Sequence, residues 1–285
     1  MVAGHVILTQ VNPPESLMAR LCDEGWQVHA WSALELTPAS ESTVPQPVAY
    51  DLVVFVSGNA VRFFRQQLES AGKLPWPVQI PAATVGPVSA QAVRRAFGSE
   101  VQVVHPPESA TTFDSEALWT RLLPMLPALR SVLIVRGGEG AEGTGRNWLR
   151  DRFVAAGVQV SLHAAYRRSP AAWSAERLEQ LRRWQRGSAP LVWVFASGDG
   201  VEAVARQIAS LADGARLPWD GCRIVVTHPR VAQAVAVAAT RNGLATRVVL
   251  DGDQRAQVSA AEVAAAVVIQ VCLPQEDAVL AAIVH

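Results

Sequence analysis

Short turns rich in hydroxyl groups and glycine follow the apolar runs of this 285-residue chain, and these residue types can bind an anion. In open α/β sheets, ligands bind beyond the carboxyl ends of the strands, so such turns are the first candidates for a site. Free amides at a helix N-terminus and nearby hydroxyls suit a carboxylate or phosphate. The turns are Thr9-Gln10, Ser57-Gly58-Asn59, Gly86-Pro87, Arg136-Gly137-Gly138, Ser197-Gly198-Asp199 and Thr227-His228-Pro229.

The same residues also fit a purely structural role. Serine, asparagine and aspartate are the preferred helix caps, so Ser57, Asn59, Ser197 and Asp199 could simply cap the helices that follow. The Ser-Gly-Asn/Asp triplet occurs in both halves of the chain, and this recurrence favours a shared anion-binding role.

The sequence lacks the residues that dinucleotide binding and metal binding require. The segment Gly138–Gly143 spells GxGxxG, but no carboxylate stands at the end of the next predicted strand to hold a ribose, so neither NAD nor FAD is expected. The six histidines show no metal spacing, and the three cysteines, which form no CxxC pair, fit a reducing cytosol. We expect neither a metal nor an organic cofactor.

The candidate turns must be positioned by alternating strands and helices. Runs rich in valine, isoleucine and leucine predict strands that are buried on both faces, and amphipathic segments between them predict helices that end at Gly72, Gly98, Gly157 and Gly243. This alternation indicates a doubly wound parallel α/β fold. The strand runs are 6–9, 52–56, 83–85, 101–104, 132–135, 158–162, 191–195, 223–226 and 247–250, and the helices 60–71, 88–97, 147–156, 200–211 and 230–241.

The second half of the chain repeats the first. Residues 51–61 match 191–201, 84–93 match 226–235, and 6–10 with 24–28 match 132–136 with 156–160. A repeat this long indicates a duplicated half-protein, so two similar α/β domains are predicted.

Composition excludes several classes of protein. Lys+Arg and Asp+Glu are both 25, and this zero net charge argues against a nucleic-acid partner. The N-terminus lacks the basic region of a signal peptide. The apolar stretch 260–273 is too short to span a bilayer and predicts a buried C-terminal helix. A cytoplasmic protein without a membrane partner is expected.

Six motifs in order along the chain resemble the uroporphyrinogen-III synthase family. Two features depart from the family pattern: Gln10 stands where an arginine is usual, and residues 141–144 look like an insertion before Arg146. The motifs are Phe55–Val61, Thr84-Val-Gly86 with Ser89-Ala90, Asp114–Leu118, Leu133–Gly137, Tyr166-Arg167-Arg168 and Val226-Thr227-His228.

The resemblance implies two flavodoxin-like domains joined by two connectors, with a cleft between them. One domain would comprise residues 1–38 and 172–285 and the other residues 39–171, with connectors near 37–50 and 164–174. The implied reaction, that of a carbon–oxygen lyase in heme biosynthesis, closes hydroxymethylbilane to uroporphyrinogen III with loss of water and inversion of ring D. It needs no cofactor, and we expect a monomer.

Site roles also follow from the resemblance. Tyr166 is the catalytic candidate, because a phenol is protonated at neutral pH and can assist departure of the hydroxyl. A tyrosine that merely packs against the hinge is the alternative. The expected substrate-binding residues are Thr9, Ser57, Gly58, Asn59, Gly86, Ser89, Arg136, Gly137, Ser197, Gly198, Thr227 and His228. A non-catalytic ligand-binding or regulatory protein on the same duplicated frame is the rival interpretation.

Overall fold

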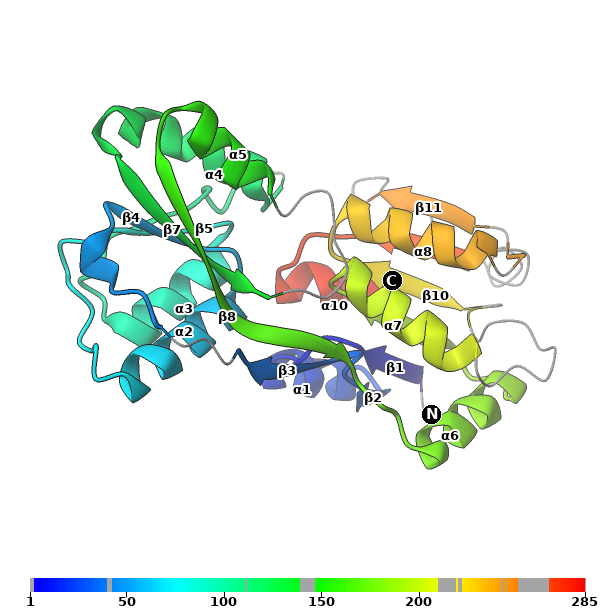
Figure 1. The fold of residues 1–285 in the computed structure, drawn as a ribbon. Helices are drawn as coiled ribbons and strands as arrows, with labels where there is room; N and C mark the ends of the chain where they lie inside the picture. The colour runs from blue at the N-terminus through cyan, green and yellow to red at the C-terminus, as the bar shows by residue number, and fades with distance from the viewer. Residues whose placement is uncertain are drawn as a thin grey trace. The chain divides into compact units, whose positions relative to one another are not determined.

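The chain forms two compact units, each with its own parallel sheet covered by helices (Figure 1). Unit 1 comprises residues 1–35 and 169–285, and unit 2 comprises residues 36–168. The structure, a computed structural model, describes residues 3–39, 43–110, 112–138, 147–209, 219, 222–241, 243–244, 246–250 and 267–284.

The sheet of unit 1 has six parallel strands in the order β11-β12-β10-β9-β1-β2. Its strands are β1 (Gly4–Leu8), β2 (Trp26–Ala30), β9 (Leu191–Phe195), β10 (Arg223–Val226), β11 (Thr246–Leu250) and β12 (Val267–Val271). Its helices are α1 (Glu15–Asp23), α6 (Ala175–Arg186), α7 (Gly198–Ala209), α8 (Pro229–Arg241) and α10 (Glu276–Val284).

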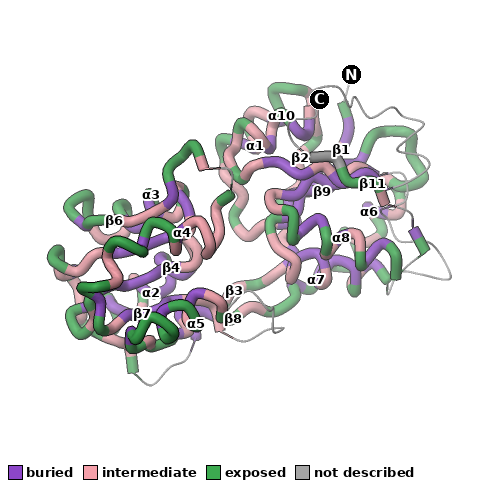
Figure 2. Tube along the Cα trace, turned by 90° about the horizontal axis from the view of Figure 1, so that it is seen from above, coloured by how far each residue is buried: buried purple, intermediate pink, exposed green. Residues whose placement is uncertain are grey.

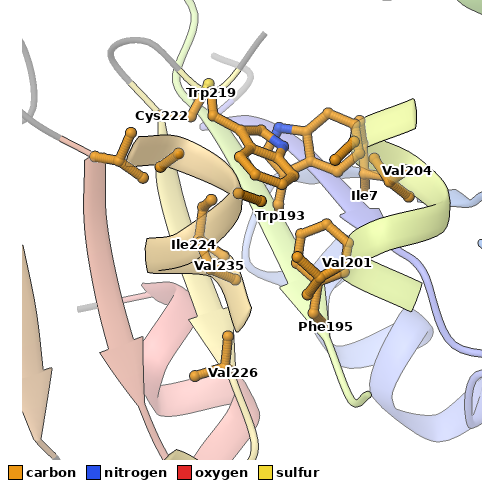
Figure 3. Close-up of a cluster of buried hydrophobic side chains, with 14 of the residues drawn as sticks. Ile7, Trp193, Phe195, Val201, Val204, Trp219, Cys222, Ile224, Val226 and Val235 are labelled. Carbon is orange, nitrogen blue, oxygen red and sulfur yellow. The ribbon is translucent and has the colours of Figure 1, made fainter. Parts of the chain in front are cut away.

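Helices cover both faces of this sheet. Successive side chains of a strand point to opposite faces, so neighbouring residues belong to different cores. Ile7 of β1 belongs to a core that includes α7 and α8, whereas its neighbours Val6 and Leu8 pack with α1 and α10. Figure 3 shows part of the first core, with the indoles of Trp193 and Trp219 beside Ile7. The uninterrupted apolar runs of the sequence are thus explained by a doubly covered sheet.

The predicted C-terminal helix over residues 260–273 is wrong for its second part, because residues 267–271 form the strand β12. Val267, Val268 and Ile269 are almost completely buried, as a position between two other strands requires. β11 has exposed Arg247 and Val248, and it lies at the edge of the sheet. Length and hydrophobicity alone could not distinguish a central strand from a buried helix.

Unit 2 repeats this architecture. Its sheet has the order β3-β8-β7-β4-β5-β6, and the pairs from β8 to β6 are all parallel. One face packs on α2 and α3 and the other on α4 and α5. The elements are β4 (Leu52–Phe55), β5 (Ala82–Thr84), β6 (Val103–Val104), β7 (Ser131–Gly137), α2 (Gly58–Ser70), α3 (Pro87–Phe97), α4 (Ser115–Leu122), α5 (Trp148–Ala155) and the 3-10 turns η1 (Pro47–Ala49) and η2 (Leu123–Ala128).

The chain crosses from one unit to the other twice, and each crossing lies within a strand. The two strands are β3 (Leu34–Pro38) and the long β8 (Gln159–Pro170), which are neighbours in the sheet. Near 164–174, where a connector is expected, the backbone is extended, because β8 pairs with both β3 and β7 and continues to Pro170.

The internal repeat agrees with the sheet positions. The order β2-β1-β9-β10 in unit 1 corresponds to β8-β7-β4-β5 in unit 2, and these are the strands of the matched sequence segments. All four glycines predicted to stop helices have positive φ, namely Gly72, Gly98, Gly157 and Gly243. The two similar α/β folds predicted from the sequence are confirmed.

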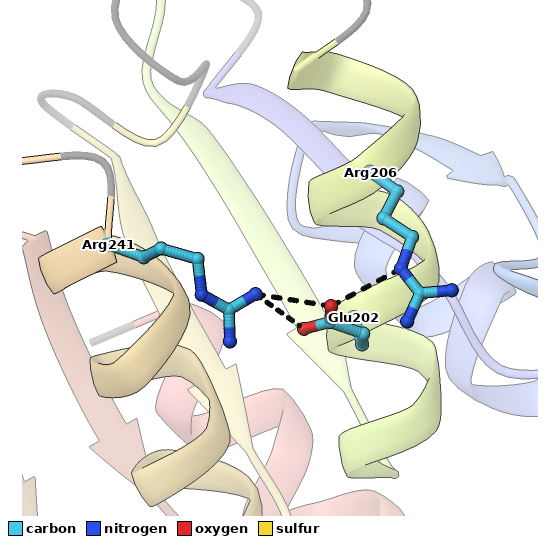
Figure 4. A network of polar contacts seen from close by, with 3 residues as sticks. All are labelled: Glu202, Arg206 and Arg241. Atoms are coloured by element: carbon cyan, nitrogen blue, oxygen red, sulfur yellow. Dashed lines mark hydrogen bonds and ion pairs between the residues drawn. The ribbon is translucent and has the colours of Figure 1, made fainter. Parts of the chain in front are cut away.

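The outer surfaces of the helices are exposed, whereas central strands such as β4 and β9 are buried (Figure 2). Glu202 of α7 accepts hydrogen bonds from Arg206, one turn later, and from Arg241 at the end of α8 (Figure 4). This network joins the two helices that follow the adjacent strands β9 and β10. Its charges are largely solvated, so it stabilises unit 1 by at most about 1 kcal/mol.

Candidate active site

The strand ends of unit 2 place the expected catalytic tyrosine beside four other residues of the same unit. Tyr166, on β8, has its hydroxyl 3.3 Å from the Oγ of Ser57, which follows β4. The ring stacks on Phe63 of α2, with the centroids 5.2 Å apart, and only 1% of the residue is exposed. A hydroxyl in these surroundings has a fixed position, which a proton donor needs.

Arg168 is the second partner of this hydroxyl, after Ser57. Its Nη2 donates a hydrogen bond of 2.9 Å to the Tyr166 oxygen, which leaves the phenol O–H able to donate elsewhere. The site residues expected from the sequence did not include Arg168. The signal was present, because residues two apart in a strand point to the same face, and Arg168 is two residues after Tyr166.

Gly137 lies opposite Tyr166 because of an irregularity in strand pairing. Arg136 of β7 pairs with Ala164 of β8, but the next residue, Gly137, pairs with Tyr166, so one residue of β8 is skipped. A Cβ on Gly137 would lie 2.9 Å from the Cζ of Tyr166 and 3.2 Å from the Nε of Arg168. Such bulges re-aim side chains near functional sites, and here glycine leaves room for the phenol ring.

Ser57 is a helix cap as well as a neighbour of the phenol. Its Oγ accepts a hydrogen bond from the amide of Ala60 at 3.1 Å, so it caps α2. Gly58 and Asn59 form the first turn of this helix, and the Asn59 Oδ1 accepts a long hydrogen bond of 3.5 Å from Arg62. The cap interpretation therefore holds for Ser57, while the unpaired amides of a helix N-terminus remain suited to an anion.

Three other expected residues of unit 2 lie at neighbouring strand ends without a described contact to Tyr166. Gly86 is the N-cap of α3 and approaches Phe113, whose ring atoms lie 3.3 Å from a Cβ placed on the glycine. Ser89 is half-buried in the first turn of α3. Arg136 donates from Nη1 to the Oδ1 of Asn147 at 3.3 Å, toward the start of α5.

The expected residues of unit 1 follow three adjacent strands, β1, β9 and β10. Thr9 is buried, and its hydroxyl donates to the carbonyl oxygen of Val194 at 2.7 Å. Ser197 caps α7 by accepting from the amide of Gly200 at 3.2 Å, and Gly198 begins that helix.

Thr227 and His228 complete this row before α8. The amide of Thr227 donates to the carbonyl oxygen of Phe195, and the His228 Nδ1 accepts from the amide of Arg230 at 3.0 Å. This hydrogen bond requires the tautomer of His228 in which Nδ1 carries no hydrogen. Unit 1 thus presents small hydroxylated residues and two helix N-termini, those of α7 and α8, at one end of its sheet.

Among the described residues, no group of three or more histidine, cysteine or acidic side chains could hold a metal ion. In the same ranges, no helix is long and apolar enough to cross a membrane. The glycine-rich segment up to Gly143, the expected insertion 141–144 and Arg146 lie outside the described residues, apart from Gly138.

A family model described as uroporphyrinogen-III synthase HemD matches residues 15–249. The solved uroporphyrinogen-III synthetase of Helicobacter pylori is 13% identical with a TM-score of 0.53, over 85% of this chain and 90% of that chain. A mutant uroporphyrinogen III synthase of Thermus thermophilus is 19% identical with a TM-score of 0.48, over the same shares. Among curated protein sequences no match was found.

Proposed function

Because the chain belongs to the uroporphyrinogen-III synthase family, we propose that Tyr166 assists the reaction of this family by donating a proton to the departing hydroxyl. The reaction is the lyase step of porphyrin biosynthesis in which hydroxymethylbilane loses water and closes to uroporphyrinogen III with ring D inverted. The observation that supports this role is the fixed phenol, hydrogen-bonded by Arg168 at 2.9 Å and next to Ser57 at 3.3 Å.

The substrate is a polyanion, and the two rows of strand-end residues supply hydrogen-bond donors for its carboxylates. We assign this role to Ser57, Gly58, Asn59, Gly86, Ser89, Arg136 and Gly137 in unit 2 and to Thr9, Ser197, Gly198, Thr227 and His228 in unit 1, with Arg136 adding a positive charge. Helix N-termini at α2, α3, α7 and α8 add partial positive charge. With a net charge of zero, local donors rather than a global field would hold the substrate.

The burial of Tyr166 sets a requirement on this role. Its phenol is covered in the structure, whereas Ser57 and Arg168 are partly exposed. A small movement of the Ser57 side chain would uncover the hydroxyl, while Phe63 holds the ring and Arg168 keeps its hydrogen bond to the phenol oxygen. The two compact units are proposed to act as the two functional domains of a cytoplasmic monomer.

The test supplies hydroxymethylbilane to the purified chain and separates the products by chromatography. We expect the type III isomer, whereas the uncatalysed closure gives type I without inversion. Tyr166→Phe should lower kcat about 100-fold, within the range for a lost proton donor, with unchanged thermal unfolding. Formation of type I alone by the unaltered chain would disprove the activity, and near-normal turnover of Tyr166→Phe would disprove the role of the phenol.

A further inference from the structure

We propose that Arg168 is a positioning residue for the Tyr166 hydroxyl: it directs the phenol proton toward the leaving group and stabilises the oxygen after the proton has left. The proposal rests on the proposed function, and it adds a residue with a distinct task to the site. It starts from the hydrogen bond of 2.9 Å in which the guanidinium is the donor and the phenol oxygen the acceptor.

The surroundings of the phenol, together with this hydrogen bond, determine where the phenol hydrogen can point. Stacking on Phe63 and the close approach to Gly137 fix the ring, so the oxygen cannot move far. Arginine has no acceptor and donates only, which means that the phenol hydrogen must point to another partner. In the structure the nearest oxygen to which it can point is the Ser57 Oγ, 3.3 Å from the phenol oxygen. A substrate hydroxyl that takes the place of Ser57 would receive the proton.

The charge of Arg168 matters during the transfer. As the C–O bond of the substrate breaks, its electron pair stays on oxygen, which takes the Tyr166 proton and departs as water. The substrate is left as a cation and Tyr166 as a phenolate. A cation already in place at the oxygen stabilises this charge without reorganisation. The proton lost from the pyrrole when the new C–C bond has formed returns the phenolate to phenol, so the cycle closes with the loss of one water molecule.

Two other roles for Arg168 have to be separated from this one. The guanidinium could bind a substrate carboxylate directly, or it could only stabilise β8. Its Cζ lies 5.5 Å from the ring centroid of Tyr166, and this cation–π contact would also be expected if Arg168 had only a structural role. A double-mutant cycle distinguishes these roles, because only a residue that acts through the hydroxyl loses its effect when the hydroxyl is removed.

The experiment compares the unaltered chain with Arg168→Met, Tyr166→Phe and the double variant, and kcat, KM and the isomer ratio are measured. We expect Arg168→Met to lower kcat about 10-fold or more, with KM changed less than about 2-fold. In the Tyr166→Phe background the same change should lower kcat by less than about 2-fold. Arg168→Lys, which keeps the charge but loses the planar geometry, should recover part of the rate.

The adjacent Arg167 provides the matched control. It is exposed and points to the opposite face of β8, so Arg167→Met should leave the kinetics unchanged. Thermal unfolding of each variant monitors folding, and if Arg168→Met does not fold, the cycle is carried out with Arg168→Lys. Equal losses of kcat in both backgrounds, or a rise in KM alone, would overturn the proposal while the synthase function stands. Absence of the type III isomer from the unaltered chain would instead remove the function itself.

Discussion

At the scale of single residues, the site requires a glycine at position 137, where a side chain would not fit. Gly137 lets the ring of Tyr166 lie against the backbone of β7, where any Cβ would overlap the phenol. Gly58, in the same unit, has no comparable constraint, because the nearest atom to its Cβ would be 3.8 Å away. The two glycines therefore have different reasons to be glycine, and substitution separates them.

We predict that Gly137→Ala shifts the Tyr166 ring and lowers kcat at least about 10-fold, with a loss of about 1–3 kcal/mol in the free energy of unfolding from overpacking. Gly58→Ala serves as the control for stability alone, and it should be neutral or stabilising by up to about 1 kcal/mol because alanine favours the helix. Kinetics and denaturant unfolding measure both effects. Normal stability and turnover of Gly137→Ala would show that the ring can move without consequence.

The sequence predicted part of this residue-scale picture. Turn composition located Ser57 and Gly137, and family resemblance located Tyr166. No local sequence pattern predicts the bulge that brings Gly137 opposite Tyr166, because the register between two strands depends on tertiary structure. Arg168 could be predicted from the two-residue period of a strand that continues past Tyr166, but the apolar run that predicts this strand ends at residue 162, whereas β8 continues to Pro170.

At the scale of elements, helix α6 is attached to the edge of the unit 1 sheet through rings. Trp184 stacks on His5 of β1 with centroids 4.3 Å apart, and it also contacts His29 of β2 and Trp31. The His5 Nδ1 and the His29 Nε2 are 3.3 Å apart and share a hydrogen bond. Burial lowers the pKa of both imidazoles, and the charge of His5 adds to the effect on His29, whose pKa falls to about 4.

This cluster predicts that unit 1 is less stable in acid. The unfolded chain takes up a proton on His29 near pH 6.5, whereas the folded chain resists it until about pH 4. The free energy of unfolding is therefore highest above pH 6.5 and declines as the pH falls toward 4. Because His29 is only half-buried, solvent screening reduces its contribution to about 1 kcal/mol.

Denaturant unfolding between pH 7 and pH 4.5 measures this effect by comparing the unaltered chain with the His5→Gln/His29→Gln variant. The variant should lose less stability over this interval, by about 1 kcal/mol. His105→Gln in unit 2, where the ring bonds only the neighbouring Pro106 carbonyl among the described contacts, is the control and should behave like the unaltered chain. Identical pH profiles for all three proteins would contradict a role for the histidine pair.

Most elements could be predicted because their patterns are local. β9 and β10 have the predicted bounds, and α8 begins one residue earlier than predicted. β12 could not be predicted, since an apolar run of that length suits a central strand and a buried helix equally. Its place between β10 and β11 also departs from the simple order of unit 2, where β5 is followed directly by β6.

At the scale of the whole molecule, the two units have separate hydrophobic cores. Among the described residues, four clusters of buried side chains are found, two in unit 1 and two in unit 2. The duplication in the sequence explains this division, because each copy of the fold buries its own sheet. The sequence alone could not say which strands pair, since the chain leaves unit 1 after its first βαβ segment and returns through β8.

Separate cores predict that the units open independently. Phe153→Ala creates a cavity in the core of unit 2 and Ile269→Ala in that of unit 1, and each should cost about 2–5 kcal/mol. Native-state hydrogen exchange should show lost protection in β4 and β7 for Phe153→Ala, with β9 and β10 unchanged, and the reverse for Ile269→Ala. If either variant lowered the protection of both sheets equally, the molecule would unfold as one cooperative body, and the two crossings in β3 and β8 would couple the cores more tightly than the separate clusters imply.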